Sequence, residues 1–146
     1  PGRLYFDIST AVVFRRGAWR HCDLKAAQGN APVYLYEIDW VTPVDGGKWG
    51  AHHGLDVPFV FDTTDLVPET VGTGNGAARL AALMSRTWIE FARRGDPNHA
   101  GLPRWPVYDL ARRPTMIFDE QTRVVDDPRG EERRVFGTVP YVQPGT

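Results

Sequence analysis

The sequence predicts a mixed α/β or α+β fold on three observations. Apolar residues recur with a helical period in residues 8–26 and again in residues 73–95. Between them, the segment VYLYEIDW, residues 33–40, is rich in β-branched and aromatic residues, which indicates a strand. Two short apolar runs near the end, residues 115–118 and 123–125, are typical of a hairpin. The order helix, strand, loop, helix and hairpin fits either architecture, although one strong central strand is little for a complete α/β domain.

Composition excludes several classes of protein. The 146 residues suffice for one domain, and 42% hydrophobic with 24% charged residues is ordinary globular usage. The net charge is −1 and no basic block is present, so nucleic-acid binding is not expected. No apolar run approaches the roughly 20 residues that a membrane-spanning helix needs, and PGRLYFDIST lacks the apolar core of a signal peptide. A single cysteine allows no internal disulfide, which favours a reducing compartment such as the cytoplasm.

The first half of the chain is expected to hold one helix and one strand. Asp7 or Ser9 can cap the helix, and Gly29 is a natural stop. Cys22 falls on the apolar stripe of this helix, where a buried structural thiol is predicted. The strand at residues 33–40 is apolar at most positions, which predicts a place inside a sheet. Proline and glycine then predict a loop over residues 42–50.

The second half begins with the clearest helix, predicted over residues 77–94 and ended by Gly95. Its apolar stripe consists of Leu80, Met84, Trp88 and Phe91. Residues 96–114 are too rich in proline to be regular, and strands are predicted near residues 116–125. GEERRVF, residues 130–136, predicts a last short helical turn.

Most residues that could carry chemistry lack the required pattern. His52 and His53 are adjacent, and side chains of adjacent strand residues point to opposite faces, so they do not predict a chelate. No metal site and no cofactor is expected. The two serines, Ser9 and Ser85, lie outside any G-x-S-x-G turn. His53 precedes Gly54 in a predicted loop, where it can be a general base or an ordinary surface histidine, and local sequence alone favours the surface histidine.

Several blocks nevertheless resemble a known family. VYLYEIDW, GAHHGLDVPFVF, WIEFARRGDPN, LPRWPVYD, TMIFD and VVDDPRGEER follow one another in the order and spacing of the C-terminal part of a type B carboxylesterase. This family includes bacterial esterases and the cholinesterases and has the α/β-hydrolase fold. The resemblance runs from about Tyr5 to Arg134 and implies that residues 1–146 are the C-terminal portion of such a fold, with edge strands of the central sheet and packing helices.

The resemblance assigns a role to one residue. In the family, the histidine directly before the glycine of the H-G-x-E/D-x-P-F-V-F block is the catalytic base, and this position is His53. No role is carried over to His52. The acid three residues later is usually Glu in the family; here it is Asp56, whose shorter side chain is expected to weaken any supporting hydrogen bond. Phe59, Val60 and Phe61 in the same block are expected to be buried.

The family also implies what this chain needs from elsewhere. Triad order is serine, acid, histidine, so the serine, the acid and the oxyanion loop are expected upstream of Pro1, and the chain alone is predicted to be inactive. The implied partners are a small carboxylic ester and the upstream part of the same enzyme. A non-catalytic module like the cholinesterase-like adhesion proteins is the alternative, and a metal-binding protein rests only on four histidines. Self-association is also predicted, through the edge of strand 33–40 and the apolar stripe of helix 77–94.

Overall fold

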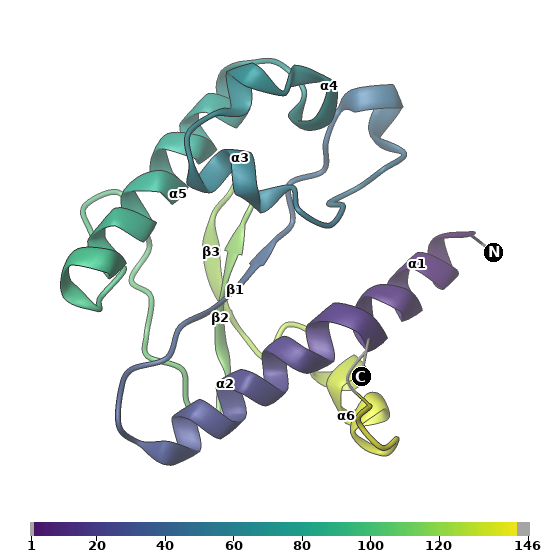
Figure 1. Cartoon of the computed structure of the whole chain (residues 1–146), viewed down its shortest axis with the longest axis vertical. Coiled ribbons are helices and arrows are strands. Elements are labelled where there is room, and N and C mark those ends of the chain that lie inside the picture. The colour runs from purple at the N-terminus through teal and green to yellow at the C-terminus, as the bar shows by residue number, and fades with distance from the viewer. Residues whose placement is uncertain (1, 143–146) are drawn as a thin grey trace. The chain divides into compact units, whose positions relative to one another are not determined.

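The computed structural model describes residues 2–142 (Figure 1). The chain divides into two compact units. The first unit comprises residues 1–35, 107–114 and 126–146, and the second comprises residues 36–106 and 115–125. Each unit therefore combines segments that are distant in sequence.

A three-stranded sheet within the described residues, nearly all of it in the second unit, confirms the predicted strands. The strands β1 (Leu35–Ile38), β2 (Pro114–Phe118) and β3 (Arg123–Asp126) lie in the order β1-β2-β3. Asp39 N–H donates to the carbonyl of Phe118 at 2.8 Å, so β1 and β2 end at the same edge of the sheet. The predicted strand at residues 33–40 is shorter than expected, and it forms one edge of the described sheet rather than its interior.

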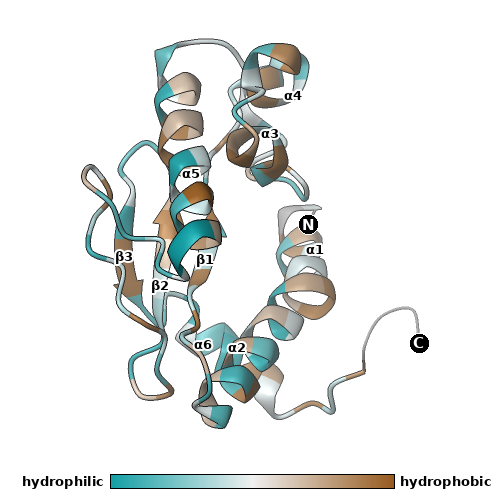
Figure 2. Cartoon of the chain, turned by 60° about the vertical axis from the view of Figure 1, so that its left-hand side comes forward, coloured by the Kyte–Doolittle hydropathy of each residue, from teal (hydrophilic) through white to brown (hydrophobic). Residues whose placement is uncertain are grey.

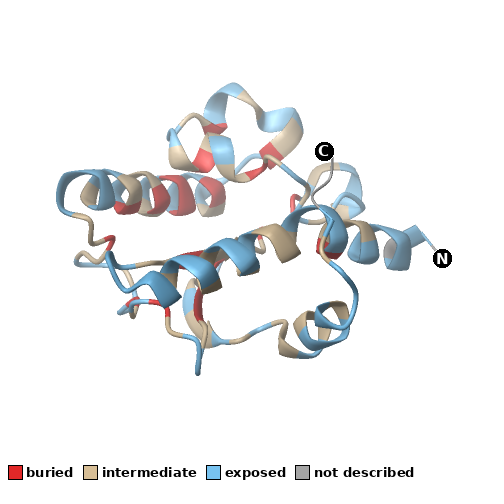
Figure 3. Ribbon diagram, turned by 60° about the horizontal axis from the view of Figure 1, so that its bottom comes forward, coloured by how far each residue is buried: buried red, intermediate tan, exposed pale blue. Residues whose placement is uncertain are grey.

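The core of the second unit lies where helices meet this sheet. The connection from β1 contains η2 (Val44–Gly47), α3 (Asp56–Val60), η3 (Thr64–Leu66) and α4 (Pro68–Val71), and α5 (Asn75–Arg94) follows. Helices α3 and α5 pack against each other, and buried positions follow one face of α5 (Figure 3). Every residue of β2 is buried. This unit therefore has an apolar core of its own.

The first unit is built on a long helical run. It contains α1 (Gly2–Thr10), the π-helical segment η1 (Ala11–Arg15), α2 (Arg16–Gln28) and the later α6 (Gly130–Gly137), which confirms the predicted last helical turn. Gly29 ends α2 in the left-handed conformation, as predicted. The start was wrong: the helix begins at Gly2, and the Ser9 hydroxyl donates to the Tyr5 carbonyl at 2.7 Å, a bond made inside a helix and not at a cap.

Helix α5 confirms the prediction for residues 77–94, with Gly95 left-handed at its end. The expected stripe is buried only in part, since Leu80 and Met84 lie in the core, Trp88 is half-buried and Phe91 is exposed. Phe91 lies in the last turn, beyond the stretch of helix whose inward face is covered. The first two residues of the stripe are therefore not available for the predicted self-association, whereas Phe91 remains exposed.

The apolar run after the histidines is a helix, which corrects the expected burial of three residues. Phe59 is fully buried, Val60 is half-buried and Phe61 is 71% exposed. Successive residues of a helix are rotated by about 100° around its axis, so Phe61 points away from the side on which Phe59 is buried. Figure 2 shows the hydrophobic colour on the strands and on α3.

No helix in residues 2–142 is both long and apolar enough to cross a membrane.

Candidate active site

His53 lies in a turn that leads directly into α3, in the connection that follows the carboxyl end of β1. Two backbone hydrogen bonds close this turn: Leu55 N–H donates to the His52 carbonyl and Val57 N–H to the Gly54 carbonyl, both at 3.2 Å. The His53 side chain is exposed. The predicted loop position and accessible imidazole are confirmed, and the backbone on either side of the imidazole is fixed.

Gly54 makes this tight turn possible. Its φ angle is +80°, in the left-handed region that side-chain-bearing residues rarely adopt. A Cβ built at this position would meet nothing within 4 Å. The requirement for glycine after His53 therefore comes from backbone conformation and not from lack of space.

Buried neighbours hold the other end of the turn. Leu55 and Phe59, on the same short segment, are fully buried. The ring of Phe59 packs edge-on against Trp40 with 5.5 Å between centroids, and the Trp40 indole donates to the Val71 carbonyl at 3.1 Å. The histidine turn is therefore anchored on the core of the second unit, which limits its movement.

His52 has a different environment from His53. Its side chain is half-buried, and its Nδ1 lies 3.1 Å from the carbonyl oxygen of His53. Because a carbonyl only accepts, this contact requires the proton on Nδ1 of His52. The two adjacent histidines thus differ in burial.

A tyrosine that sequence reasoning placed only in a strand contacts the turn. The Tyr36 hydroxyl of β1 donates to Oδ2 of Asp56, the first residue of α3, at 2.8 Å. The shorter Asp56 side chain thus reaches a partner at ordinary hydrogen-bond length. Burial, followed by the hydrogen bond to Asp56, raises the pKa of Tyr36 well above its usual value. The one available signal was that a tyrosine hydroxyl in a buried strand needs a partner.

The other candidate residues belong to other elements of the chain. Ser9 is in α1 and Ser85 is in α5, and neither stands at a strand-to-helix turn. Cys22 is half-buried in α2, and burial, with the charge of Asp23, raises its pKa to about 11. His99 Nε2 lies 3.0 Å from the Thr87 hydroxyl. Within residues 2–142, no three His, Cys, Asp or Glu side chains gather as a metal ion would need.

The turn offers general acid–base chemistry. An exposed imidazole on a rigid turn can take a proton from a nucleophile and return it to a leaving group. Strand β1, the histidine turn and the helices that pack on the sheet form a portion of an α/β-hydrolase fold, as the solved structures below bear out.

Comparison with known proteins gives the family. The family model described as "Carboxylesterase family" matches residues 2–136, so the chain belongs to the carboxylesterase family. Phenmedipham hydrolase of Pseudarthrobacter oxydans is 33% identical over 138 residues, which are 87% of this chain and 26% of the relative. Para-nitrobenzyl esterase of Bacillus subtilis is 31% identical over 106 residues, covering 71% of this chain and 21% of the relative.

The solved structures agree. Carboxylesterase EST55 of Geobacillus stearothermophilus superposes with a TM-score of 0.76 and 41% identity, covering 89% of this chain and 27% of that chain. A thermophilic pNB esterase also gives a TM-score of 0.76, at 28% identity, covering 88% of this chain and 26% of that one. The chain thus spans about a quarter of the length of these relatives.

Proposed function

We propose that this chain contributes the histidine base of a serine-dependent carboxylic ester hydrolase, and that the base is His53. The observation that carries the proposal is the exposed imidazole in a turn closed by Gly54 and anchored by buried Leu55 and Phe59. Family membership supports ester hydrolysis as the reaction. The substrate is a small carboxylic ester.

The chemistry divides between this chain and groups outside it. The serine hydroxyl attacks the ester carbonyl while His53 takes its proton, and the protonated imidazole then delivers that proton to the leaving alcohol. Water repeats the sequence on the acyl-enzyme. Ser9 and Ser85 are helical residues and do not fit the nucleophile, so the serine, the carboxylate that orients His53 and the oxyanion donors come from outside these 146 residues.

Two matched substitutions in the full-length protein test this role. His53→Ala is expected to lower kcat for a p-nitrophenyl ester by on the order of 10⁴-fold or more, because it removes the proton acceptor. His52→Ala is the control, since it changes a neighbouring histidine with a backbone contact, and its effect is expected to be mild. Equal losses in the two variants would refute the assignment.

The 146-residue chain gives a second test. Purified by itself, it is expected to show no turnover of a p-nitrophenyl ester, because it lacks a nucleophile turn and an oxyanion loop. Turnover that disappears on His53→Ala would show that the chain supplies those groups in another way. A full-length protein that is inactive with His53 intact would favour the non-catalytic interaction module.

A further inference from the structure

Two segments of the second unit that lie 20 residues apart in sequence are joined by the Tyr36–Asp56 hydrogen bond. Tyr36 belongs to β1, and Asp56 is the first residue of the helix that follows the histidine turn. Both side chains are half-buried. The bond therefore connects the sheet to the base of the turn that carries His53.

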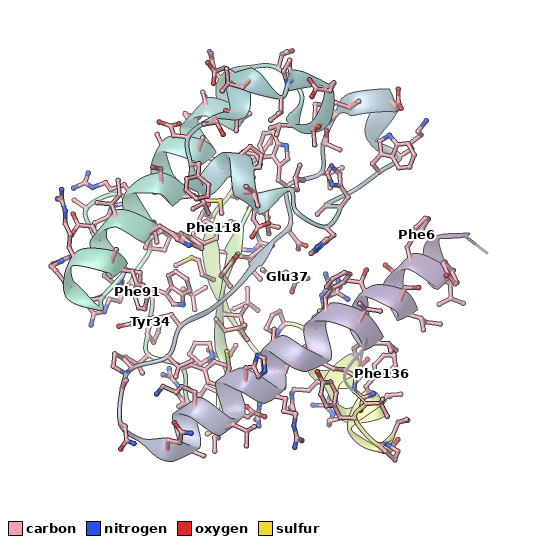
Figure 4. All side chains as sticks on the ribbon, viewed as in Figure 1. Phe6, Tyr34, Glu37, Phe91, Phe118 and Phe136 are labelled. Carbon is pink, nitrogen blue, oxygen red and sulfur yellow. The ribbon has the colours of Figure 1, made fainter. Side chains whose placement is uncertain are left out.

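The ring of Tyr36 is held from two sides. It packs edge-on against Trp88 of α5, with centroids 4.9 Å apart, and against Phe118 of β2, at 6.0 Å. Phe118, which is labelled in Figure 4, also contacts Trp88, with 6.0 Å between the ring centroids, and this contact closes a cluster of three aromatic rings. Such packing leaves the ring little freedom, so the direction in which its hydroxyl points is set by β2 and α5.

Asp56, the acceptor of the Tyr36 hydrogen bond, is close to His53 along the backbone. Asp56 is three residues from His53, and the two overlapping turns at residues 52–55 and 54–57 fix the backbone between them. A displacement of Asp56 is thus passed to His53. Gly54, whose conformation has open space around it, is the point between them at which the backbone can pivot if the contact is lost.

A hydrogen bond between a hydroxyl and a carboxylate fixes the position of Asp56 better than an apolar contact would. It is directional and short, and the charge of the acceptor strengthens it. Within the described residues, no Lys or Arg forms an ion pair with Asp56, so Tyr36 sets the direction of this carboxylate.

We propose that Tyr36 and Asp56 form a positioning pair for His53, in which the tyrosine hydroxyl holds the carboxylate and thereby fixes the turn that carries the imidazole. The proposal rests on the proposed role of His53. Neither residue touches the reacting atoms, and both act through the backbone of the turn. Loss of the pair lowers the fraction of enzyme molecules in which the imidazole is correctly placed, so it reduces kcat more than it changes KM.

The chain contains a matched control. The Tyr108 hydroxyl donates to Asp23 at 2.8 Å, the same distance as in the Tyr36–Asp56 pair, and both residues belong to the first unit. Tyr36→Phe and Tyr108→Phe each remove one hydroxyl and keep the ring. A general loss of stability affects both variants, whereas a change in His53 placement affects only Tyr36→Phe.

The decisive experiment measures kcat and KM for a p-nitrophenyl ester in the full-length protein, with thermal melting of each variant. Tyr36→Phe is expected to lower kcat by about tenfold with KM nearly unchanged, as the loss of a charge-assisted hydrogen bond allows. Tyr108→Phe is expected to leave both constants unchanged. Asp56→Ala should lower kcat as much as Tyr36→Phe does. The double variant, Tyr36→Phe with Asp56→Ala, should lower kcat no further than either single variant. Asp56→Glu should recover most of the turnover that Asp56→Ala loses.

A spectroscopic readout accompanies the kinetics. The ¹⁵N and ¹H resonances of the His53 imidazole are expected to shift in Tyr36→Phe and to stay in place in Tyr108→Phe. If Tyr36→Phe fails to fold, the comparison of Asp56→Ala with Asp56→Glu carries the test. Equal kcat in wild type, Tyr36→Phe and Asp56→Ala would overturn the pair while His53→Ala still abolishes turnover. Full activity in His53→Ala would overturn the proposed function and the pair with it.

Discussion

Different interactions stabilise the interior of each of the two units. The second unit buries large apolar side chains, among them Trp40, Phe59, Met84 and Phe118. The first unit has few buried apolar residues in its described part, and the helical run from α1 to α2 exposes many of them. The apolar residues that are most exposed on α1 are Leu4, Tyr5, Phe6 and Ile8, and Figure 4 labels Phe6 near the start of this helix.

Polar contacts take the place of the apolar core in the first unit. Asp23 accepts from Tyr108 and lies 3.4 Å from Arg113, while Arg133 binds Asp127 through two hydrogen bonds of 3.0 and 2.7 Å. Non-directional burial of apolar area dominates folding energetics, whereas ion pairs contribute modestly. The difference indicates that the segment carrying His53 can hold its own geometry, while the first unit depends more on charge.

The largest expected effect compares a buried with an exposed phenylalanine. Phe59→Ala in the second unit should lower the free energy of unfolding by about 3–5 kcal/mol, because it leaves a cavity in a fully buried site. Phe6→Ala on α1, where the side chain is 65% exposed, should change it by less than about 0.5 kcal/mol. Urea unfolding followed by circular dichroism measures both, and similar losses would remove the contrast between the units.

The reactivity of Cys22 tests how far α2 is covered. Because burial, with Asp23, raises the pKa of Cys22 to about 11, the native protein binds this proton more tightly than the unfolded chain. The resulting stability is fully present below the unfolded value, ~8.5, and is lost as pH rises through about 11.

Alkylation by iodoacetamide near pH 8 should accordingly be on the order of a hundredfold slower in the native chain than in concentrated urea. Equal rates under the two conditions would show that this thiol is open to solvent and that α2 is as exposed as α1.

A smaller effect is expected at the Asp127–Arg133 pair. The hydrogen bonds from Arg133 lower the pKa of Asp127, so the pair stabilises the native state above the unfolded value, ~3.9, and this contribution is lost as pH falls below it. Asp127→Asn should cost about 1 kcal/mol at neutral pH and nothing once the carboxyl is protonated.

Asparagine is a clean substitute at this position, because residue 127 has a φ angle of +46° and asparagine tolerates that region. Asp126 is an exposed neighbour, and Asp126→Asn is the control. This substitution should leave the free energy of unfolding unchanged at both pH values. Denaturant unfolding at two pH values measures the difference. A cost that persists in acid would mean that charge is not what stabilises this part of the first unit.

The smallest effect is expected for self-association of the 146-residue chain. Formation of a dimer would double the mass of the sedimenting species. Exposed apolar residues on α1 and the edge position of β1 both favour self-association. Leu4→Ser combined with Phe6→Ser should shift the sedimenting species towards the 16.4 kDa monomer if α1 forms the contact, and should leave it unchanged if β1 does. A monodisperse wild-type monomer at high micromolar concentration would contradict both.

Much of the fold was predictable where periodicity is long. Helix α5 was placed within two residues of its start, because some twenty residues carry one apolar stripe and Gly95 ends it. The hairpin β2–β3 was also predicted. Helix α3 was not, since in a five-residue apolar segment a helical period cannot be told from a buried strand. No sequence pattern predicted the π-helical segment η1. This segment joins α1 to α2, so the helical run starts at Gly2, earlier than predicted.

The candidate site was predictable in one respect only. The loop position of His53 followed from Gly54 and the surrounding pattern, but its suggested role came from resemblance to a family. The contact of Tyr36 with Asp56 was missed, because two residues 20 positions apart carry no spacing rule that would join them. Contacts of this kind depend on how β1 and α3 pack, and packing is decided by the whole unit.

The turn after His53 is sensitive to handedness rather than to size. Gly54 has a left-handed backbone with open space around its Cα, so an L-alanine there is opposed by its own backbone while a D-alanine is not. In a chain assembled by chemical ligation, the mirror-image residue should therefore preserve the turn that the natural alanine distorts. A methyl group of the same volume would be harmful or harmless according to its chirality alone.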